Sequence, residues 1–259
     1  TSTDGEDTEH LKFSVATDGR VTVTVIGLYA LLRQVFARGP SLIATLAFWT
    51  HPLVMDHAFE GRYYGPWMAG VVLFALLLCR ARNEKPPAWS TIVWAAVVSV
   101  FVCTIHYFGI VSLALVLLGE AVIHRNRVLR HVRLLVAIGL GPVALTVLGL
   151  LLLPSQRATV PSSWIAEPTV WLVADFGAAV LFPHYLVGVM IVGWLGYLLW
   201  PVPTTATPGD TARRLGGVSC LLLIVPVLIG FSYLVQPVQE PRYGITAVLG
   251  LAPAVAWLI

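Results

Sequence analysis

A short stretch between two apolar runs carries more polar chemistry than any other part of the chain. Residues 56–64 contain two carboxylates, a histidine, an arginine and two tyrosines. Charged side chains are costly inside a lipid bilayer unless they face water or a partner. We therefore expect this stretch to form one wall of a polar site at a membrane surface.

Two arginines are candidates for binding a phosphate group. A guanidinium can hold a phosphate through two parallel hydrogen bonds, and it does so more strongly when it is partly desolvated. Arg62 and Arg242 both lie in short polar stretches beside apolar runs, and we interpret them as ligands of a lipid phosphate. The alternative is that they pair with Glu60 and Glu240 and only cap helices.

Acidic and aromatic residues near these arginines could bind a sugar. Asp56 and Glu60 are four residues apart and would share one face of a helix, so either could act as a general base or accept hydrogen bonds from hydroxyl groups. Asp56 is our candidate catalytic residue. The candidate sugar-binding residues are Glu60, Tyr63, His106, Tyr107 and Tyr243. Tyrosines and tryptophans at span ends, Trp67 among them, are also typical interface anchors.

No strong metal motif accompanies these residues. His57 and His106 could join the acids in a metal site, but they lack the close spacing that metal ligands usually show. His106 by itself also fits a hydrogen-bonded histidine at a helix end. We expect no bound metal, with a divalent cation as the weaker alternative, and no cofactor other than the substrate itself.

The composition places the chain in a membrane. Of its 259 residues 58% are hydrophobic and 11% charged, and the mean hydropathy is +0.83, which excludes an ordinary soluble domain. The formal charge of +3 is spread over short loops, so it does not indicate nucleic-acid binding. We predict an all-α protein, a polytopic bundle of transmembrane helices whose partners include membrane lipid.

The apolar runs predict about nine spans. Residues 1–20 form a polar tail and the start of the first span, and 21–259 form a single transmembrane domain with 155–185 as an extracytoplasmic loop. A hydrocarbon core of ~30 Å requires about 20 apolar residues per helix. The expected spans are 13 or 21 to 36, 41–55, 64–79, two within 89–124 that turn at 106–109, 134–153, 185–200, 218–235 and 245–259.

The basic residues orient this stack. Most of the 16 Lys and Arg residues fall near 33–38, 80–85, 125–133 and 213–214, which the positive-inside rule places in the cytoplasm. This arrangement requires that the apolar run 171–182 does not cross, so we expect a short interfacial helix there. Residues 56–64, 106–107, 155–185 and 236–243 then share the extracytoplasmic surface.

Several short motifs resemble one enzyme family over nearly the whole chain. Residues 51–53, His-Pro-Leu, and 60–64, Glu-Gly-Arg-Tyr-Tyr, resemble the Ser-Pro-Leu and Gln-Glu-Ala-Arg-Pro-Tyr segments of GT-C-type membrane glycosyltransferases. Residues 104–109 are similar to their Thr-His-Tyr-Phe-Gly segment, and 241–243 to their late Pro-Arg-Tyr segment. Residues 11–36 are similar to the helix that opens with Leu-Arg-Leu-Pro-Ser. The relatives include protein O-mannosyltransferases and lipid A aminoarabinose transferases.

The resemblance implies transfer of a sugar from a polyprenyl- or dolichyl-phosphate donor to a hydroxyl of a protein, lipid or glycan. It implies an enzyme of a plasma membrane, in bacteria the inner one, acting at the extracytoplasmic face. Arg62 and Arg242 would neutralise the departing phosphate, and Glu60, His106 and the tyrosines would shape the sugar pocket.

One family feature has no counterpart in the chain. Family members carry an acidic motif in the first outer loop, after an initial helix, and we expect this chain to lack both. Phe59 and Gly61 also replace the family's Gln and Ala. A lipid or small-molecule transporter and a non-catalytic lipid-binding relative or fragment therefore remain alternative functions.

Overall fold

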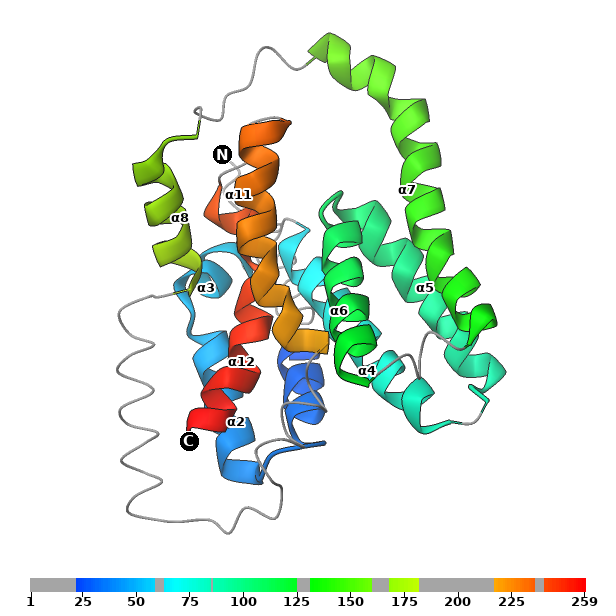
Figure 1. Ribbon diagram of the computed structural model, residues 1–259, viewed down its shortest axis with the longest axis vertical. Helices are drawn as coiled ribbons and strands as arrows, with labels where there is room; N and C mark the ends of the chain where they lie inside the picture. Colours follow the sequence, from blue (N-terminus) through cyan, green and yellow to red (C-terminus); the bar gives the residue numbers. More distant parts are fainter. Residues whose placement is uncertain are drawn as a thin grey trace, which may run out of the picture.

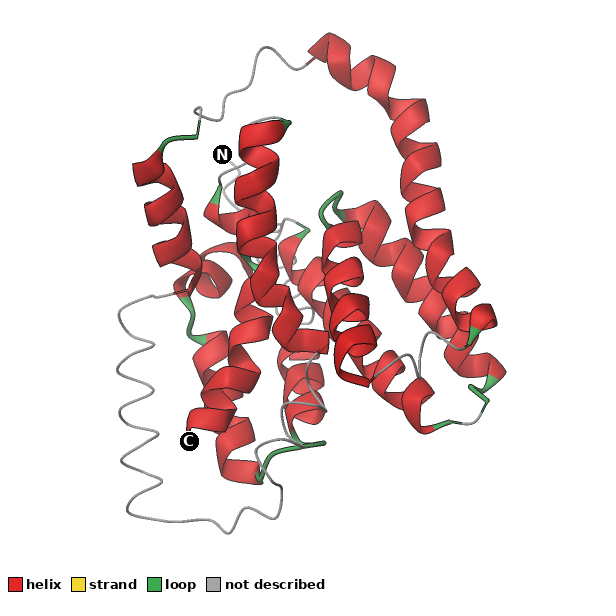
Figure 2. Cartoon of the chain, in the orientation of Figure 1, coloured by secondary structure: helices red, strands yellow, loops and turns green. Residues whose placement is uncertain are grey.

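The computed structural model describes residues 22–58, 63–84, 86–124, 131–159, 168–181, 217–235 and 240–259, and within these ranges it contains helices and no strand. The all-helical fold is therefore confirmed (Figures 1 and 2). The helices are Thr22–Leu32, α2 Arg38–Trp49, α3 Pro52–Ala58, α4 Tyr64–Asn83, α5 Trp89–Ile105, α6 Gly109–His124, α7 Val132–Thr159, α8 Val170–Leu181, η1 Cys220–Leu223, α11 Ile224–Leu234, η2 Pro241–Gly244 and α12 Thr246–Leu258.

Three helical segments have the length and apolar composition needed to cross a membrane: Tyr64–Asn83, Val132–Leu151 and Gly217–Leu234. Shorter apolar helices accompany them at Thr22–Leu32, Trp89–Ile105, Gly109–Val122 and Thr246–Leu258. The chain therefore has the helix lengths and composition of a membrane protein.

The helix α4 lies at the centre of the bundle. Its 20 residues span about 30 Å, and apolar side chains are buried on most sides of it, so it lacks the single apolar stripe of a surface helix. It contacts α5, α6, α12 and α3. Its first residue, Tyr64, and its penultimate residue, Arg82, therefore lie at opposite ends of this helix, about 30 Å apart.

The helices α5 and α7 pack closely because small residues meet where they cross. The Ser99 hydroxyl donates to the Ile138 carbonyl at 2.6 Å, and a Cβ on Gly141 would overlap the backbone of Ser99. The opposite face of α7 is apolar and exposed between residues 132 and 151, as at Val136, Val143 and Leu150. Such a continuous apolar surface is expected where a helix faces lipid.

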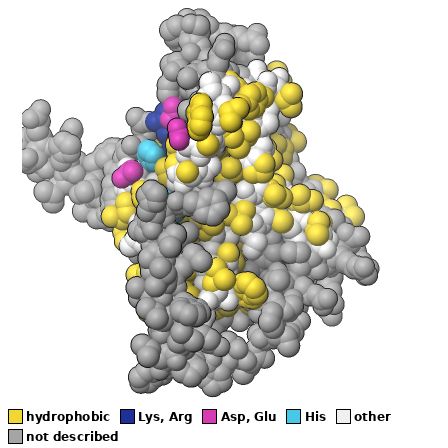
Figure 3. Space-filling view, turned by 60° about the vertical axis from the view of Figure 1, so that its left-hand side comes forward, with side chains coloured by type: hydrophobic (Ala, Val, Ile, Leu, Met, Phe, Trp, Pro, Cys, Tyr) yellow, Lys and Arg dark blue, Asp and Glu magenta, His cyan; other side chains and the backbone are white. Residues whose placement is uncertain are grey.

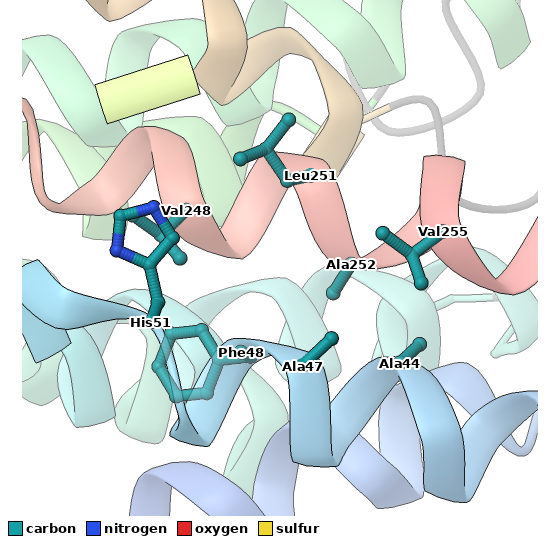
Figure 4. Close-up of a pocket in the computed structure, with 8 residues that line it drawn as sticks. All are labelled: Ala44, Ala47, Phe48, His51, Val248, Leu251, Ala252 and Val255. Carbon is teal, nitrogen blue, oxygen red and sulfur yellow. The ribbon is translucent and has the colours of Figure 1, made fainter. Parts of the chain in front are cut away.

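The helices α2 and α12 also meet through small side chains. Ala44 and Ala47 of α2 face Ala252 and Val255 of α12, and the gap that remains between the helices is about 10 Å³, the size of one water (Figure 4). His51 projects from the end of α2 toward α12 in the same view. This gap is too small to serve as a ligand site.

Most expected element boundaries agree with the structure where it describes them. The turn at 106–109 divides α5 from α6, and the apolar run 171–182 corresponds to the 12-residue α8. The prediction of one continuous helix over 41–55 is wrong, because the helix is interrupted at His51, between α2 and α3. Pro52 begins α3, and the His51 ring accepts the hydrogen bond of the Leu53 N–H at 3.2 Å. The spans expected before residue 22 and at 185–200 lie outside the described residues.

A buried ion pair joins α4 to α6 at the end of the bundle far from Tyr64. Arg82 and Glu120 approach to 3.5 Å with side chains only 11% and 4% exposed. Gly217, which begins the helix leading into η1, packs against Glu120 so closely that a Cβ there would lie 3.0 Å from a carboxylate oxygen. Glu120 does not stand out in the sequence, because one acid in an apolar run changes the hydropathy little.

Gly141→Ala is expected to destabilise the protein by about 1–3 kcal/mol, because the new methyl group forces α5 and α7 apart. Gly139→Ala, two residues away and with nothing within 4 Å of its Cβ position, is the matched control and should be neutral or slightly stabilising. Thermal unfolding in detergent would measure this difference, and equal effects of the two substitutions would contradict the close crossing.

Glu120→Gln and Arg82→Gln are each expected to destabilise by about 3–5 kcal/mol, because each leaves a buried charge without its counter-charge. The double variant should cost less than the sum of the two, as a double-mutant cycle of unfolding would show. Arg80→Gln, which removes a pair with Glu84 in which Arg80 is 61% exposed, is the control and should cost less than about 1 kcal/mol. Additive effects at Arg82 and Glu120 would mean that the two charges do not interact.

Candidate functional site

Aromatic rings from three separate parts of the chain meet at the beginning of α4. We call this group the aromatic cluster; its members are Tyr63, Tyr64, Trp67, His106, Tyr107, Phe108 and Tyr243. His106 lies in its middle, stacked on Trp67 at 4.2 Å between ring centroids with 11° between the ring planes, and on Tyr107 at 4.7 Å and 17°. Tyr63 and Tyr243 approach the His106 ring at 4.8 Å and 5.7 Å.

The chain folds into this cluster through two tight turns. The α5–α6 turn is closed by the Gly109 N–H, which donates to the His106 carbonyl at 2.8 Å, and a Cβ on Gly109 would overlap the Val102 carbonyl. The second turn, η2, carries Tyr243 and begins with Pro241. It packs on α8, where a Cβ on Gly244 would come within 2.9 Å of the Val180 side chain. Glycine at both turns thus allows the cluster to assemble.

His106 is neutral and presents a buried hydrogen-bond donor. Its Nδ1 accepts the Phe108 N–H at 3.1 Å, so the proton of the neutral ring is on Nε2. The side chain is 4% exposed, and burial lowers the pKa of His106 to about 3. Among the described residues, Nε2 has no hydrogen-bond partner.

His51 has the same local geometry as His106, but its Nε2–H donor has a partner. Its Nδ1 accepts the Leu53 N–H two residues ahead, as in His106, and its Nε2 donates to the Val180 carbonyl of α8 at 3.2 Å. Burial lowers the pKa of His51 to about 4, partly offset by that carbonyl. His51 therefore joins two helices, whereas the corresponding donor of His106 is available to a ligand.

A second buried donor lies in the aromatic cluster. Trp67 is fully buried, and within the described part of the chain its indole N–H has no acceptor. Buried N–H groups without partners are rare, because each costs roughly 1–3 kcal/mol. Two such donors on stacked rings are a pattern that a bound acceptor group would explain.

Arg242 places a positive charge beside the cluster. The carbon at the centre of its guanidinium lies 5.7 Å from the Tyr243 ring centroid, and its side chain is only 18% exposed. Its Nε is 3.9 Å from a Glu240 carboxylate oxygen, which is the pairing expected as the alternative to phosphate binding. At that distance the contact is an ion pair without a close hydrogen bond, so an anion could compete with Glu240 for the guanidinium.

The structure brings together five of the residues selected from the sequence: Tyr63, His106, Tyr107, Arg242 and Tyr243. Their positions are consistent with a common site but do not test the roles predicted for them. Arg62 and Glu60 lie outside the described residues.

Asp56, the candidate base, is exposed on α3. The next residue, His57, reaches the cluster through Tyr64, with ring centroids 5.4 Å apart. On the face seen in Figure 3, the acidic, basic and histidine side chains gather in one place beside a wide hydrophobic surface.

Three members of the cluster, Tyr64, Trp67 and Phe108, were not selected as site residues from the sequence. Trp67 was interpreted as an interface anchor, and Tyr64 and Phe108 were noted only as parts of the motifs at 60–64 and 104–109. Their spacing could have indicated a shared role, since Tyr64 and Trp67 are three residues apart and share a helix face. Only the fold shows that this face meets His106.

Comparison of the chain with protein-family models, with curated proteins and with solved structures gives no match in any of the three. The described ranges contain no group of three His, Cys, Asp or Glu side chains that could hold a metal ion, so the expectation about metals remains a prediction.

The two buried histidines should make stability depend on pH. Their pKa values in the folded protein, about 4 and about 3, lie below the unfolded value of 6.5, so between these values only the unfolded state binds the protons. Stability should therefore fall as the pH drops below about 6.5, by up to about 1.4 kcal/mol per pH unit for each histidine. Thermal unfolding at pH 7.5 and 5.0 should show a smaller decrease in His51→Asn and His106→Asn than in the unsubstituted protein. An unchanged decrease in both variants would contradict the neutral assignments.

Proposed function

We propose that the chain is a membrane glycosyltransferase of the GT-C type, which takes a sugar from a polyprenyl- or dolichyl-phosphate donor and transfers it to an acceptor hydroxyl. The observation that carries this proposal is the pair of buried N–H donors, on His106 and Trp67, in an aromatic cluster beside Arg242. The motifs at residues 51–64, 104–109 and 241–243 support it independently.

Each group has a role that its chemistry suits. The Arg242 guanidinium, with Arg62 as its expected companion, binds the lipid phosphate and stabilises the negative charge that develops on it as the sugar leaves. Neutral His106 and Trp67 donate to oxygen atoms of the sugar or the phosphate. Tyr63, Tyr107 and Tyr243 provide ring faces for the sugar, and Glu60 accepts from its hydroxyls.

The acceptor hydroxyl must lose its proton during transfer, and Asp56 is the proposed base. Its exposed position on α3, one residue before His57, leaves it accessible to an acceptor arriving from the aqueous side. The acceptor belongs to a protein, a lipid or a glycan, since all three carry suitable hydroxyl groups.

We further propose that the protein is multi-pass, with about nine spans, and lies in a bacterial inner membrane with the aromatic cluster at the extracytoplasmic surface. Two features support this orientation. The cluster and the ends of α4 and α6 that carry Arg82 and Glu120 are separated by the length of one span. Among the described residues, Arg80 and Arg82 of α4 and Arg133 of α7 belong to the latter end. The helix α8, at about 18 Å, is too short to cross by itself.

A transporter is the second candidate, and the buried pair of Arg82 and Glu120 favours it. Ionisable side chains inside a helical bundle often line a path for a substrate or a proton. On this alternative, Glu120→Gln would abolish transport of a lipid or small molecule and leave the affinity for polyprenyl phosphate unchanged.

Polyprenyl phosphate should bind to the protein in nanodiscs, and Arg242→Gln should weaken that binding about 10–100-fold, because a charge-assisted hydrogen bond contributes about 1.5–3 kcal/mol. His106→Asn, which keeps an acceptor for the Phe108 N–H but removes the Nε2–H donor, should weaken binding about 3–10-fold. With a sugar-loaded donor, Asp56→Asn should abolish transfer and leave donor binding intact.

Arg38→Gln is the matched control, since Arg38 is exposed at the beginning of α2, away from the cluster. It should bind polyprenyl phosphate as tightly as the unsubstituted protein. Binding that is equally insensitive to Arg242→Gln and His106→Asn would refute the proposed donor site. Normal binding without any sugar transfer would instead identify a non-catalytic lipid-binding protein.

A further inference from the structure

A cavity lies between the beginnings of α5 and α7, at the end of the bundle away from the aromatic cluster. We call it the terminal cavity; its described lining residues are Pro86, Pro87, Ala88, Trp89, Ile92, His131, Val132, Arg133 and Leu134. Its volume of about 590 Å³ falls within the range of small-molecule binding sites, about 300–1,000 Å³.

The helix α5 connects the two sites and fixes their separation. It begins with Trp89 at the terminal cavity and ends before His106 in the aromatic cluster, and its 17 residues are about 25 Å long. This is close to the thickness of a hydrocarbon core, about 30 Å. When the cluster lies at one membrane surface, the terminal cavity lies near the other.

The lining of the cavity is amphipathic. Prolines, Trp89 and Ile92 provide apolar walls, whereas Arg133 provides a positive charge and His131 a further polar group. None of the described lining residues is acidic. The ligand that matches this lining has an apolar body and an anionic group.

A carboxylate beside the cavity, that of Glu84, is already occupied. Glu84 accepts from the Ala88 N–H at 2.7 Å, from the Thr91 hydroxyl at 3.1 Å and from Arg80 at 2.8 Å. These hydrogen bonds satisfy backbone and side-chain donors at the beginning of α5, and they hold the Glu84 carboxylate in place. Arg133 is exposed, and no ion pair of its side chain with another described residue is seen, so its charge is available to a ligand.

Apolar surface leads away from the cavity along the two helices. Trp89 is 69% exposed and Val93 52% on α5, and Val132 is 68% exposed and Val136 63% on α7. The two residues of each pair are four apart and share one helix face, so the apolar surface extends from the cavity along both helices. They give an acyl chain a surface to lie on while its head group remains at the cavity.

We propose that the terminal cavity binds an anionic phospholipid, with its phosphate at Arg133 and His131 and its acyl chains along the exposed faces of α5 and α7. The charge and the adjoining apolar surface together select a lipid over a soluble phosphate, which could use only the charge. The site is separate from the proposed donor site and does not depend on sugar transfer.

The test is native mass spectrometry of the full chain in detergent, titrated with phosphatidylglycerol or phosphatidylcholine. The protein should retain phosphatidylglycerol at least tenfold more tightly than phosphatidylcholine. Arg133→Gln should reduce phosphatidylglycerol affinity about tenfold or more. Arg38→Gln, the same change at an exposed arginine outside the cavity, should have no effect.

A second variant separates ligand binding from stability. Val132→Asp places a negative charge in the cavity lining at the first position of α7, where an acidic residue is favourable for a helix. It should therefore weaken phosphatidylglycerol binding by tenfold or more without lowering the thermal unfolding temperature.

Three outcomes would overturn the proposal. Equal losses in Arg133→Gln and Arg38→Gln would show only diffuse attraction of anionic lipid. Unchanged phosphatidylglycerol binding in Val132→Asp would place the lipid elsewhere. If glycerol 3-phosphate displaced phosphatidylglycerol completely at an equal concentration, the site would bind a soluble phosphate, and the acyl chains would contribute nothing to affinity.

Discussion

The structure depends on satisfying polar groups where little water can reach them. Several buried hydroxyls do so locally: Ser41 donates to the Ala37 carbonyl, Thr45 to Ser41 and Ser112 to Phe108, each one helical turn back. Ser99 instead donates across to α7, and the buried charge of Glu120 lies against Arg82. Within the described residues, the free N–H donors of His106 and Trp67 stand out against this pattern. Each unsatisfied donor lowers the stability of the folded protein, and hydrogen bonds to a bound ligand would offset that cost.

Two helices set the scale of the molecule. The central helix α4 carries Tyr64 of the aromatic cluster at one end and Arg82 at the other, and α5 runs from the terminal cavity to the turn that holds His106. Each is about as long as the hydrocarbon core is thick. Continuous helices therefore hold the aromatic cluster and the terminal cavity apart. Between the two sites, α5 packs closely against α7 where Gly141 meets Ser99.

Sequence patterns predicted the parts of this fold that depend on hydrophobicity and turn residues. Long apolar runs gave α4, α7 and the helix from Gly217, and the polar turn at His106 separated α5 from α6. The break at His51 was missed, because it depends on a ring nitrogen capping the next helix. In the site, residue type suggested His106, Tyr243 and Arg242 as neighbours. It could not reveal that Trp67 stacks on His106, because that contact requires two helices to meet.

His51 and His106 form an internally matched pair of imidazoles. Both rings hold the same tautomer through the same local bond, and they differ at the Nε2–H donor: in His51 it donates to a carbonyl of α8, and in His106 it has no acceptor among the described residues. In a nitrogen-15 spectrum the His51 resonance is thus a reference inside the molecule, recorded under the same lipid and temperature. A ligand that enters the aromatic cluster changes one signal of the pair, and a general change in conformation changes both.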